Sequence, residues 1–414
     1  MTTSPRPIAA LRDVGRFWSA ERAALAAGAV ALLIAATADL GAGVVLSGAR
    51  PRILEVPGLL LLVPAAIALR GSTFGAFGAR LGTALAVGTY DPELRPGSWL
   101  WRHVEAVAIL TLVTSVEAAV LAKLVAGLLG QPTVPLVDLI VISTVGGVLA
   151  SILLLFVTLA LARQSSRRGW NMDDVAAPAI TATGDLLTIP ALLLATGLAG
   201  RPGSSVIVAV ALVLCTAAAL VYGWLHRRAD VRRLVRESVV VLTGAALVSV
   251  LAGAVLEGRD DVFLAVPVLL VLFPPFVAIF GALGGILASR LTSKLHLGVV
   301  RPSLRPEKLV WHEMSMTFLF AAGVYLYIGV AAWGLAQLMD IGSPSLPTVL
   351  AITLLGGLAG TTILAVVATT AATATYRLGL DPDNHAIPVV TSVMDFLGTL
   401  CLVGAVAFLQ VGVT

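Results

Sequence analysis

Charged side chains are scarce in this chain of 414 residues, where Asp, Glu, Lys and Arg together make up 12%. A soluble domain carries about 25% charged residues, and the hydrophobic share here is 58%. A water-soluble core could not bury that much apolar surface. Only two cysteines occur, Cys215 and Cys401, each within an apolar run, so neither a disulfide framework nor a Cys/His metal cluster is expected. The net charge of +4 comes without a basic run interleaved with aromatics, so nucleic acid is not an expected partner.

Catalytic motifs are also missing. The sequence contains no nucleotide-binding loop, no GxSxG and no HExxH. No nucleophile and base recur together, so we do not expect an enzyme. The segments between apolar runs are too short for an ATPase domain. Any transport by this chain would therefore run down an electrochemical gradient or be coupled to an ion.

Long apolar runs fill most of the chain. A membrane-spanning helix needs about 20 apolar residues, and the sequence contains eleven such runs. We therefore predict an all-α polytopic membrane protein. The predicted spans are 22–48, 56–87, 101–127, 134–163, 175–200, 204–225, 235–256, 262–297, 309–338, 346–376 and 385–411.

The lysines and arginines predict the orientation. With the N-terminus inside, 19 of the 27 Lys and Arg residues fall in inner segments and 4 in outer ones. Inner loops of membrane proteins are enriched in these residues. We therefore expect a multi-pass cell-membrane protein with a cytoplasmic N-terminus and, after eleven spans, an outer C-terminus.

The sequence repeats itself with an offset of 210 residues. Pairs at this offset include Pro64 and Pro274, Trp101 and Trp311, Gly71 and Gly281, Gly75 and Gly285, Gly146 and Gly356, and Arg167 and Arg377. We divide the chain into a first five-helix repeat at 1–203, a linking transmembrane helix at 204–225 and a second five-helix repeat at 226–414. Five spans would leave the second copy inverted, and the linking helix restores its orientation. The result is a 5 + 1 + 5 pseudo-dimer of parallel repeats about an axis along the membrane normal.

Each repeat contains one acid deep in an apolar helix. The segments NMDDVAAPAITATGD, 171–185, and DPDNHAIPVVTSVMD, 381–395, end in Asp185 and Asp395. An ionised group at lipid depth is costly and marks a functional site by default. Thr181 and Thr391 precede the acids by one turn and could add hydroxyl oxygens. Two acids facing the axis could hold a hydrated Mg²⁺; the alternative is that each is protonated or bonded to a neighbouring helix.

Other polar residues have weaker cases. Asp174, Asp383 and Asn384 are either helix N-caps or a vestibule at the inner mouth. Glu117 is deep enough to be a second candidate, together with Lys123. The remaining unpaired acids, Asp39 among them, are expected to serve helix packing or the interface.

These motifs resemble a known family. The segments 171–185 and 380–395 resemble the DPDN-x-x-x-P…D signature of the MgtE magnesium channels and of solute carrier family 41, and 62–84 resembles the long second helix of that family. The resemblance implies two fused MgtE-type units around a Mg²⁺ pore, with the pore acid at Asp185 and Asp395. Two features depart from it: the acid usual in the second helix falls at Phe74 and Gly284, and only about twenty residues precede the first span.

We therefore expect a channel or carrier for divalent cations, Mg²⁺ favoured, with Mg²⁺ as the transported ion and no organic cofactor. A Mg²⁺/Na⁺ or cation/H⁺ exchanger is the first alternative, and a non-transporting scaffold subunit is the second. The expected partners are the cation and the lipid bilayer. A fused pseudo-dimer needs no second chain, so a monomer fits this organisation.

Overall fold

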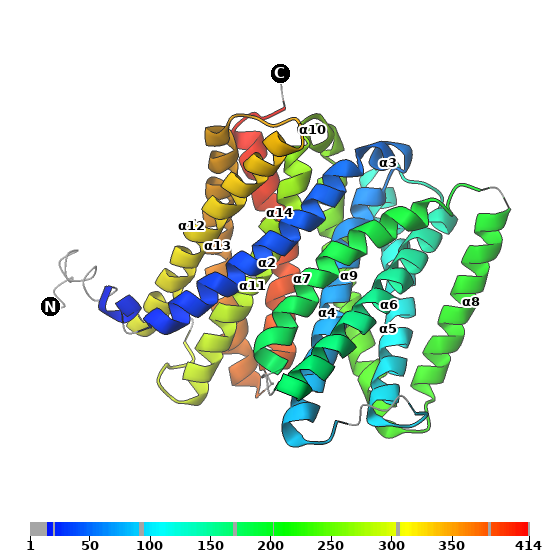
Figure 1. The fold of residues 1–414 in the computed structure, drawn as a ribbon, viewed down its shortest axis with the longest axis horizontal. Helices are drawn as coiled ribbons and strands as arrows, with labels where there is room; N and C mark the ends of the chain where they lie inside the picture. Colours follow the sequence, from blue (N-terminus) through cyan, green and yellow to red (C-terminus); the bar gives the residue numbers. More distant parts are fainter. Residues whose placement is uncertain are drawn as a thin grey trace. The chain divides into compact units, whose positions relative to one another are not determined.

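The structure, a computed structural model, describes residues 15–19, 21–90, 95–168, 172–201, 203–303, 307–379 and 382–412. In these ranges the chain forms helices and no strands (Figure 1). Ten helices are long and apolar enough to span a membrane, and α7 adds a shorter apolar stretch at Ile180–Thr196. The protein is therefore an all-helical, polytopic membrane protein, as its composition predicts.

The helices follow the predicted spans closely. Their bounds are α2 Arg22–Gly48, α3 Arg50–Glu55, α4 Leu59–Val87, α5 Trp99–Leu129, α6 Leu136–Arg168, α7 Met172–Thr196, α8 Ser204–Trp224, α9 Ala229–Glu257, α10 Asp260–Ala265, α11 Val268–His296, α12 Lys308–Leu338, α13 Leu346–Leu378 and α14 Pro382–Phe408. Two predicted spans, 56–87 and 262–297, are shorter than expected because a break precedes each main helix.

The two breaks show that the repeats share local structure. A six-residue helix precedes each break, α3 in the first repeat and α10 in the second. The backbone then turns at Val56 with φ −125° and ψ 78°, and at Val266 with φ −122° and ψ 78°. Each valine precedes a proline, which disfavours the helical conformation of the residue before it. The 210-residue offset thus predicts equivalent backbone conformations.

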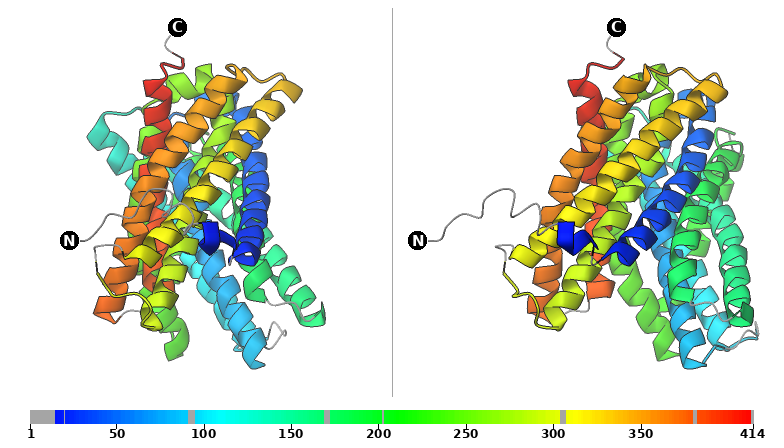
Figure 2. Two further views of the ribbon diagram at one scale, coloured as in Figure 1. Left: turned by 90° about the vertical axis from the view of Figure 1, so that its left-hand side faces the viewer. Right: turned by 60° about the vertical axis from the view of Figure 1, so that its left-hand side comes forward.

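Helix packing divides the chain into two units. Unit 1 comprises Met1–Thr37 and Pro275–Thr414, and unit 2 comprises Ala38–Pro274. In unit 1, α12 packs on α13 and α13 on α14, which run side by side in both views of Figure 2. In unit 2, α4 packs against α7 and α9, and α5 packs against α6, α8 and α9.

The first helix of each repeat packs on the other repeat. Within unit 2, α9 of the second repeat lies on α4 and α5 of the first. An added Cβ at Gly253 of α9 would clash with the carbonyl oxygen of Leu61. An added Cβ at Gly43 of α2 would clash with the carbonyl oxygen of Val271, at the start of α11. Gly43 and Val271 lie 210 residues from Gly253 and Leu61, respectively. The first helix of each repeat therefore makes the same contact with the second helix of the other repeat.

Hydrogen bonds also join each first helix to the other repeat. The Ser47 hydroxyl donates to the Pro267 carbonyl at 3.3 Å. At the equivalent place, the Gly58 N–H donates to Glu257 Oε1 at 2.6 Å. Ser47 and Glu257 occupy corresponding positions in the two repeats. The packing of each first helix on the other repeat is therefore stabilised both by close backbone contact and by a hydrogen bond.

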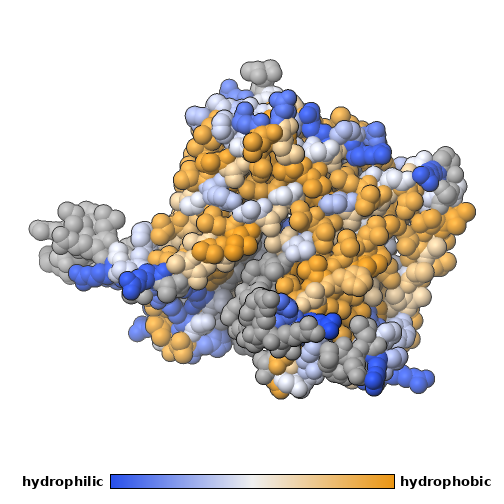
Figure 3. All heavy atoms as spheres, in the orientation of Figure 1, coloured by the Kyte–Doolittle hydropathy of each residue, from blue (hydrophilic) through white to orange (hydrophobic). Residues whose placement is uncertain are grey.

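The linking helix α8 is largely exposed and apolar. Its exposed side chains include Ile207, Val210, Leu214 and Val221. In Figure 3 the helix contributes hydrophobic surface, and hydrophilic residues gather near helix ends on the face shown. A helix with so much apolar exposure suits a lipid-facing position.

Candidate cation site

Asp185 lies inside unit 2 and is buried at 3% exposure. It belongs to the apolar part of α7, which starts at Ile180 and ends at Thr196. At about 1.5 Å per residue, Asp185 lies roughly 16 Å from the C-terminal end of this helix. The hydrocarbon core is about 30 Å thick, and the mid-membrane position of Asp185 stays a prediction.

Asp39 of α2 is the carboxyl partner of Asp185. Its side chain is 2% exposed, and the two carboxyl groups lie within hydrogen-bonding reach of each other. A carboxylate oxygen only accepts, so such a bond requires a proton on one of the two groups. Asp39 Oδ1 is buried and has no hydrogen-bond partner among the residues that the structure describes. The sequence analysis assigned Asp39 to helix packing, so this contact was missed.

A matched glycine in the second helix of each repeat lies against the helix that carries the acid. An added Cβ at Gly71 would lie 3.8 Å from the Thr181 methyl, within unit 2. Within unit 1, an added Cβ at Gly281 would lie 3.3 Å from the Thr391 methyl. These matched contacts fix the two threonines one turn before the two acids.

Asp395 is partly buried in α14 of unit 1. Its backbone carbonyl accepts the Thr399 hydroxyl at 2.6 Å. Thr391 donates its own hydroxyl to the Ile387 and Pro388 carbonyls, each at 3.0 Å. The hydroxyl oxygen keeps acceptor capacity for a cation or a water. Asp185 and Asp395 belong to different packing units, so their pairing stays a prediction.

The side chains of the predicted vestibule, Asp174, Asp383 and Asn384, lie outside the described residues. Their backbone is described, and it contradicts the alternative that Asp174 and Asn384 are helix N-caps. The helices begin earlier than predicted, at Met172 and Pro382. Asp174 and Asn384 are therefore third residues of their helices and not caps. Acidic groups in a first helical turn are favoured by the helix dipole.

Glu117 of α5 contacts another helix. The Thr243 hydroxyl of α9 lies 2.9 Å from one of its carboxylate oxygens and 3.1 Å from the other. Lys123 does not pair with it: the ammonium group donates to the Thr133 hydroxyl at 2.7 Å and to the Val134 carbonyl at 3.2 Å. The suggested pairing of Glu117 with Lys123 is thus wrong, because the lysine closes the loop between α5 and α6.

A buried arginine also marks the first repeat. Arg70 of α4 is 1% exposed and donates from one guanidinium nitrogen to the Ser115 hydroxyl at 2.6 Å. The equivalent residues of the second repeat are Phe280 and Tyr325, whose rings lie 5.3 Å apart. The two repeats therefore fill the same place with a hydrogen-bonded arginine and serine in one case and an aromatic pair in the other.

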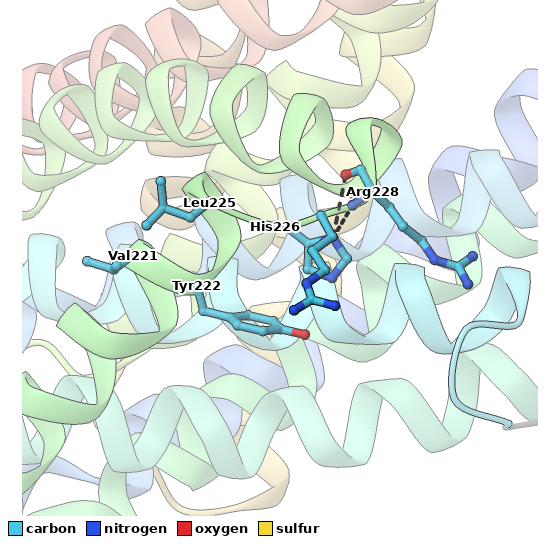
Figure 4. A pocket seen from close by; sticks show the side chains of 6 residues that line it. Val221, Tyr222, Leu225, His226 and Arg228 are labelled. Carbon is cyan, nitrogen blue, oxygen red and sulfur yellow. Dashed lines mark hydrogen bonds between the residues drawn. The ribbon is translucent and has the colours of Figure 1, made fainter.

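A surface pocket of about 510 Å³ lies at the end of α8 (Figure 4). Tyr222, His226 and Arg228 line it with Val221, Leu225 and Arg227. Its arginines repel cations, and the buried acids do not line it. Within the described part of the chain, no group of three or more His, Cys, Asp or Glu side chains could hold a metal ion. The buried acids are the better candidate site.

Comparison with known proteins identifies the family. The MgtE family model, described as "Divalent cation transporter", matches residues 63–195 and 273–405, more than half of the chain. Both matched segments have the 210-residue offset of the repeat.

The chain is also similar to two members of solute carrier family 41. It is 27% identical over 365 residues to member 2 of Xenopus laevis, covering 83% of this chain and 64% of that protein. It is 24% identical over 395 residues to member 3 of Rattus norvegicus, covering 90% of this chain and 85% of that protein. No solved structure matches the chain. The match in both repeats shows that the chain belongs to the MgtE family.

Proposed function

We propose that this protein moves divalent cations across the cell membrane, with Mg²⁺ the favoured ion. The observation that supports this most directly is the acid that recurs on the fifth helix of each repeat, buried at 3% exposure in the case of Asp185. The family and its described activity agree with this proposal. A membrane-buried carboxylate is suited to attract a cation.

The path in this proposal follows the pseudo-twofold axis between the repeats. The reciprocal contacts of Gly43 with Val271 and of Gly253 with Leu61 support such an axis, since each first helix docks on the opposite repeat. On the axis, Asp185 and Asp395 hold a hydrated Mg²⁺ between them, and Thr181 and Thr391 add hydroxyl oxygens. Mg²⁺ releases its water reluctantly, which favours contact through water over full dehydration.

The direction of flow follows from the membrane potential. With the N-terminus inside and a negative interior, each positive charge gains about 2.3 kcal/mol per 100 mV on entering. A divalent ion therefore gains about twice that amount. No ATP-driven step is needed for uptake under this gradient.

Uptake of Mg²⁺ into proteoliposomes tests the proposal. We expect the wild-type protein to take up Mg²⁺ and Asp185→Asn/Asp395→Asn to lose at least about 90% of the rate, since each acid supplies charge that an amide lacks. Glu117→Gln is the matched control, because it also neutralises a carboxyl group within a membrane helix. Equal uptake by the double variant would move the path away from these acids.

The same assay separates the rival functions. Uptake that requires an opposing Na⁺ or H⁺ gradient would identify an exchanger. No flux of any divalent cation by folded wild-type protein, under all gradients, would favour a scaffold subunit and reject the proposal.

A further inference from the structure

The position of Asp39 is fixed by small residues on the same helix. Gly41 brings α2 close to α7, where an added Cβ would lie 3.2 Å from a Leu186 methyl. Gly43 brings α2 into contact with the backbone of Val271. Asp39 and Gly43 are one turn apart and share a helix face. Gly41 thus holds α2 against α7, and the carboxyl group of Asp39 lies close to that of Asp185.

Helix packing alone does not account for this carboxyl group. A polar group that only joins two helices is expected to have its hydrogen bonds satisfied. Asp39 Oδ1 has no partner among the described residues, although the side chain is 2% exposed. The remaining contact, to Asp185, joins two groups of the same charge type. A buried oxygen with free lone pairs beside a second acid has the properties of an unfilled ligand position.

We propose that Asp39 and Asp185 together form a divalent-cation site in the first repeat, with Asp39 as a direct ligand. The choice of Mg²⁺ as its ion rests on the function proposed above. Two carboxylates balance the charge of one divalent ion, which removes the cost of holding two buried negative groups side by side. The bound ion also gives Asp39 Oδ1 the partner that it lacks.

The donor set selects the class of cation. Carboxylate oxygens are hard ligands that suit Mg²⁺, Ca²⁺ and Mn²⁺. Zinc sites are built mainly from Cys and His, and no cluster of three such residues or acids is present among the described residues. With only two protein carboxylates, water must supply part of the coordination shell. Mg²⁺ accepts this arrangement because it usually keeps several waters.

The second repeat does not have the same pair. The 210-residue offset places Ser249 of α9 at the position of Asp39. Serine carries no charge, so the corresponding helix of the second repeat offers no carboxyl group at this position. The site formed by Asp39 and Asp185 therefore occurs once in each chain. One half of the pseudo-dimer differs from the other in the ligands that it offers.

Equilibrium binding tests the proposal on the full-length protein. MgCl₂ and MnCl₂ are titrated by calorimetry, and the rise in unfolding temperature with each salt is measured in parallel. We expect Asp39→Asn to raise the Kd at least about tenfold, because even an outer-shell partner of a metal ligand contributes roughly 10–100-fold. Ser249→Asn, at the matching position of the second repeat, should leave the Kd unchanged.

Folding is checked without added cation. Asn at position 39 can still hydrogen-bond to Asp185, so the variant is expected to unfold near the wild-type temperature. Should it fail to fold, Asp39→Ser supplies the residue of the second repeat and is tested in the same way. Wild-type affinity in either folded variant would overturn the proposal.

The results distinguish this inference from the proposed function. If Asp39→Asn binds Mg²⁺ and takes it up like wild type while Asp185→Asn/Asp395→Asn stops uptake, the function stands and the inference fails. If the wild type binds Mg²⁺ through Asp39 but takes up no divalent cation, the inference stands and the proposed function fails.

Discussion

Replacing Gly253 by alanine should weaken the packing of α9, the first helix of the second repeat, on α4 of the first repeat. Gly253 lies on α9, and its added Cβ would clash with the Leu61 carbonyl oxygen of α4. The contact is with backbone, so no flexible side chain can move aside. Either α9 must shift away from α4 or the bond geometry must distort.

The expected size follows from two opposing terms. Alanine is favoured over glycine within a helix by about 1 kcal/mol. Overpacking at a tight contact costs about 1–3 kcal/mol, and a rigid backbone partner places this site at the upper end. We expect Gly253→Ala to lower the free energy of unfolding by about 2 kcal/mol. Gly244 lies on the same helix, and an added Cβ there meets no described atom within 4 Å, so Gly244→Ala should be neutral or stabilising.

The two variants are compared by unfolding in detergent micelles, with denaturant or heat. A lower midpoint for Gly253→Ala, with an unchanged or higher midpoint for Gly244→Ala, is the expected result. Equal midpoints would refute the reasoning, because the two alanines have the same helix propensity and differ only in the contact with Leu61.

Three further predictions follow from described contacts. Gly43→Ala should weaken Mg²⁺ binding as well as stability, since Asp39 lies one turn away on the same face; binding equal to wild type would contradict this. Glu313 has a fully buried side chain, 2.5 Å from Arg290 and paired with Lys294, so Glu313→Gln should destabilise by about 3 kcal/mol. Glu237, exposed and 2.7 Å from Arg233, is the control, and Glu237→Gln should cost under about 0.5 kcal/mol. Glu117→Gln should keep the wild-type uptake rate, because the amide oxygen can still accept from Thr243; a large loss would restore Glu117 as a ligand.

The sequence predicts the helices well because membrane spans leave a strong signal. Each of the eleven runs corresponds to a long helix in the structure. Two of the errors lie at the starts of α4 and α11, where the runs continue through a proline-linked break. Apolarity continues through such a break, while the backbone conformation does not. Repeated Val-Pro pairs at 56–57 and 266–267 are the signal that could have shown it.

The candidate site is only partly predictable from the repeat. The offset identifies Asp185 and Asp395, since both occur in matching positions. Asp39 has no acidic match, and a search for repeated residues therefore discards it. The structure identifies Asp39 as a candidate because α2 packs against α7. A pairwise contact between distant helices depends on which faces pack, and that information is not present in the periodicity of either helix.

Fusion of the repeats explains why such unmatched residues can persist. In a symmetric homodimer, every residue facing the axis must accept its own copy. Here Asp39 corresponds to Ser249, Arg70 to Phe280 and Ser47 to Glu257. A symmetric pair would contain every buried Asp39 and Arg70 twice, doubling their desolvation cost. A fused chain can keep each charge in one half and fill the matching place with an uncharged or aromatic side chain. We therefore expect the functional differences between the halves to concentrate at unmatched buried polar positions, such as Asp39, which lies close to a repeated acid.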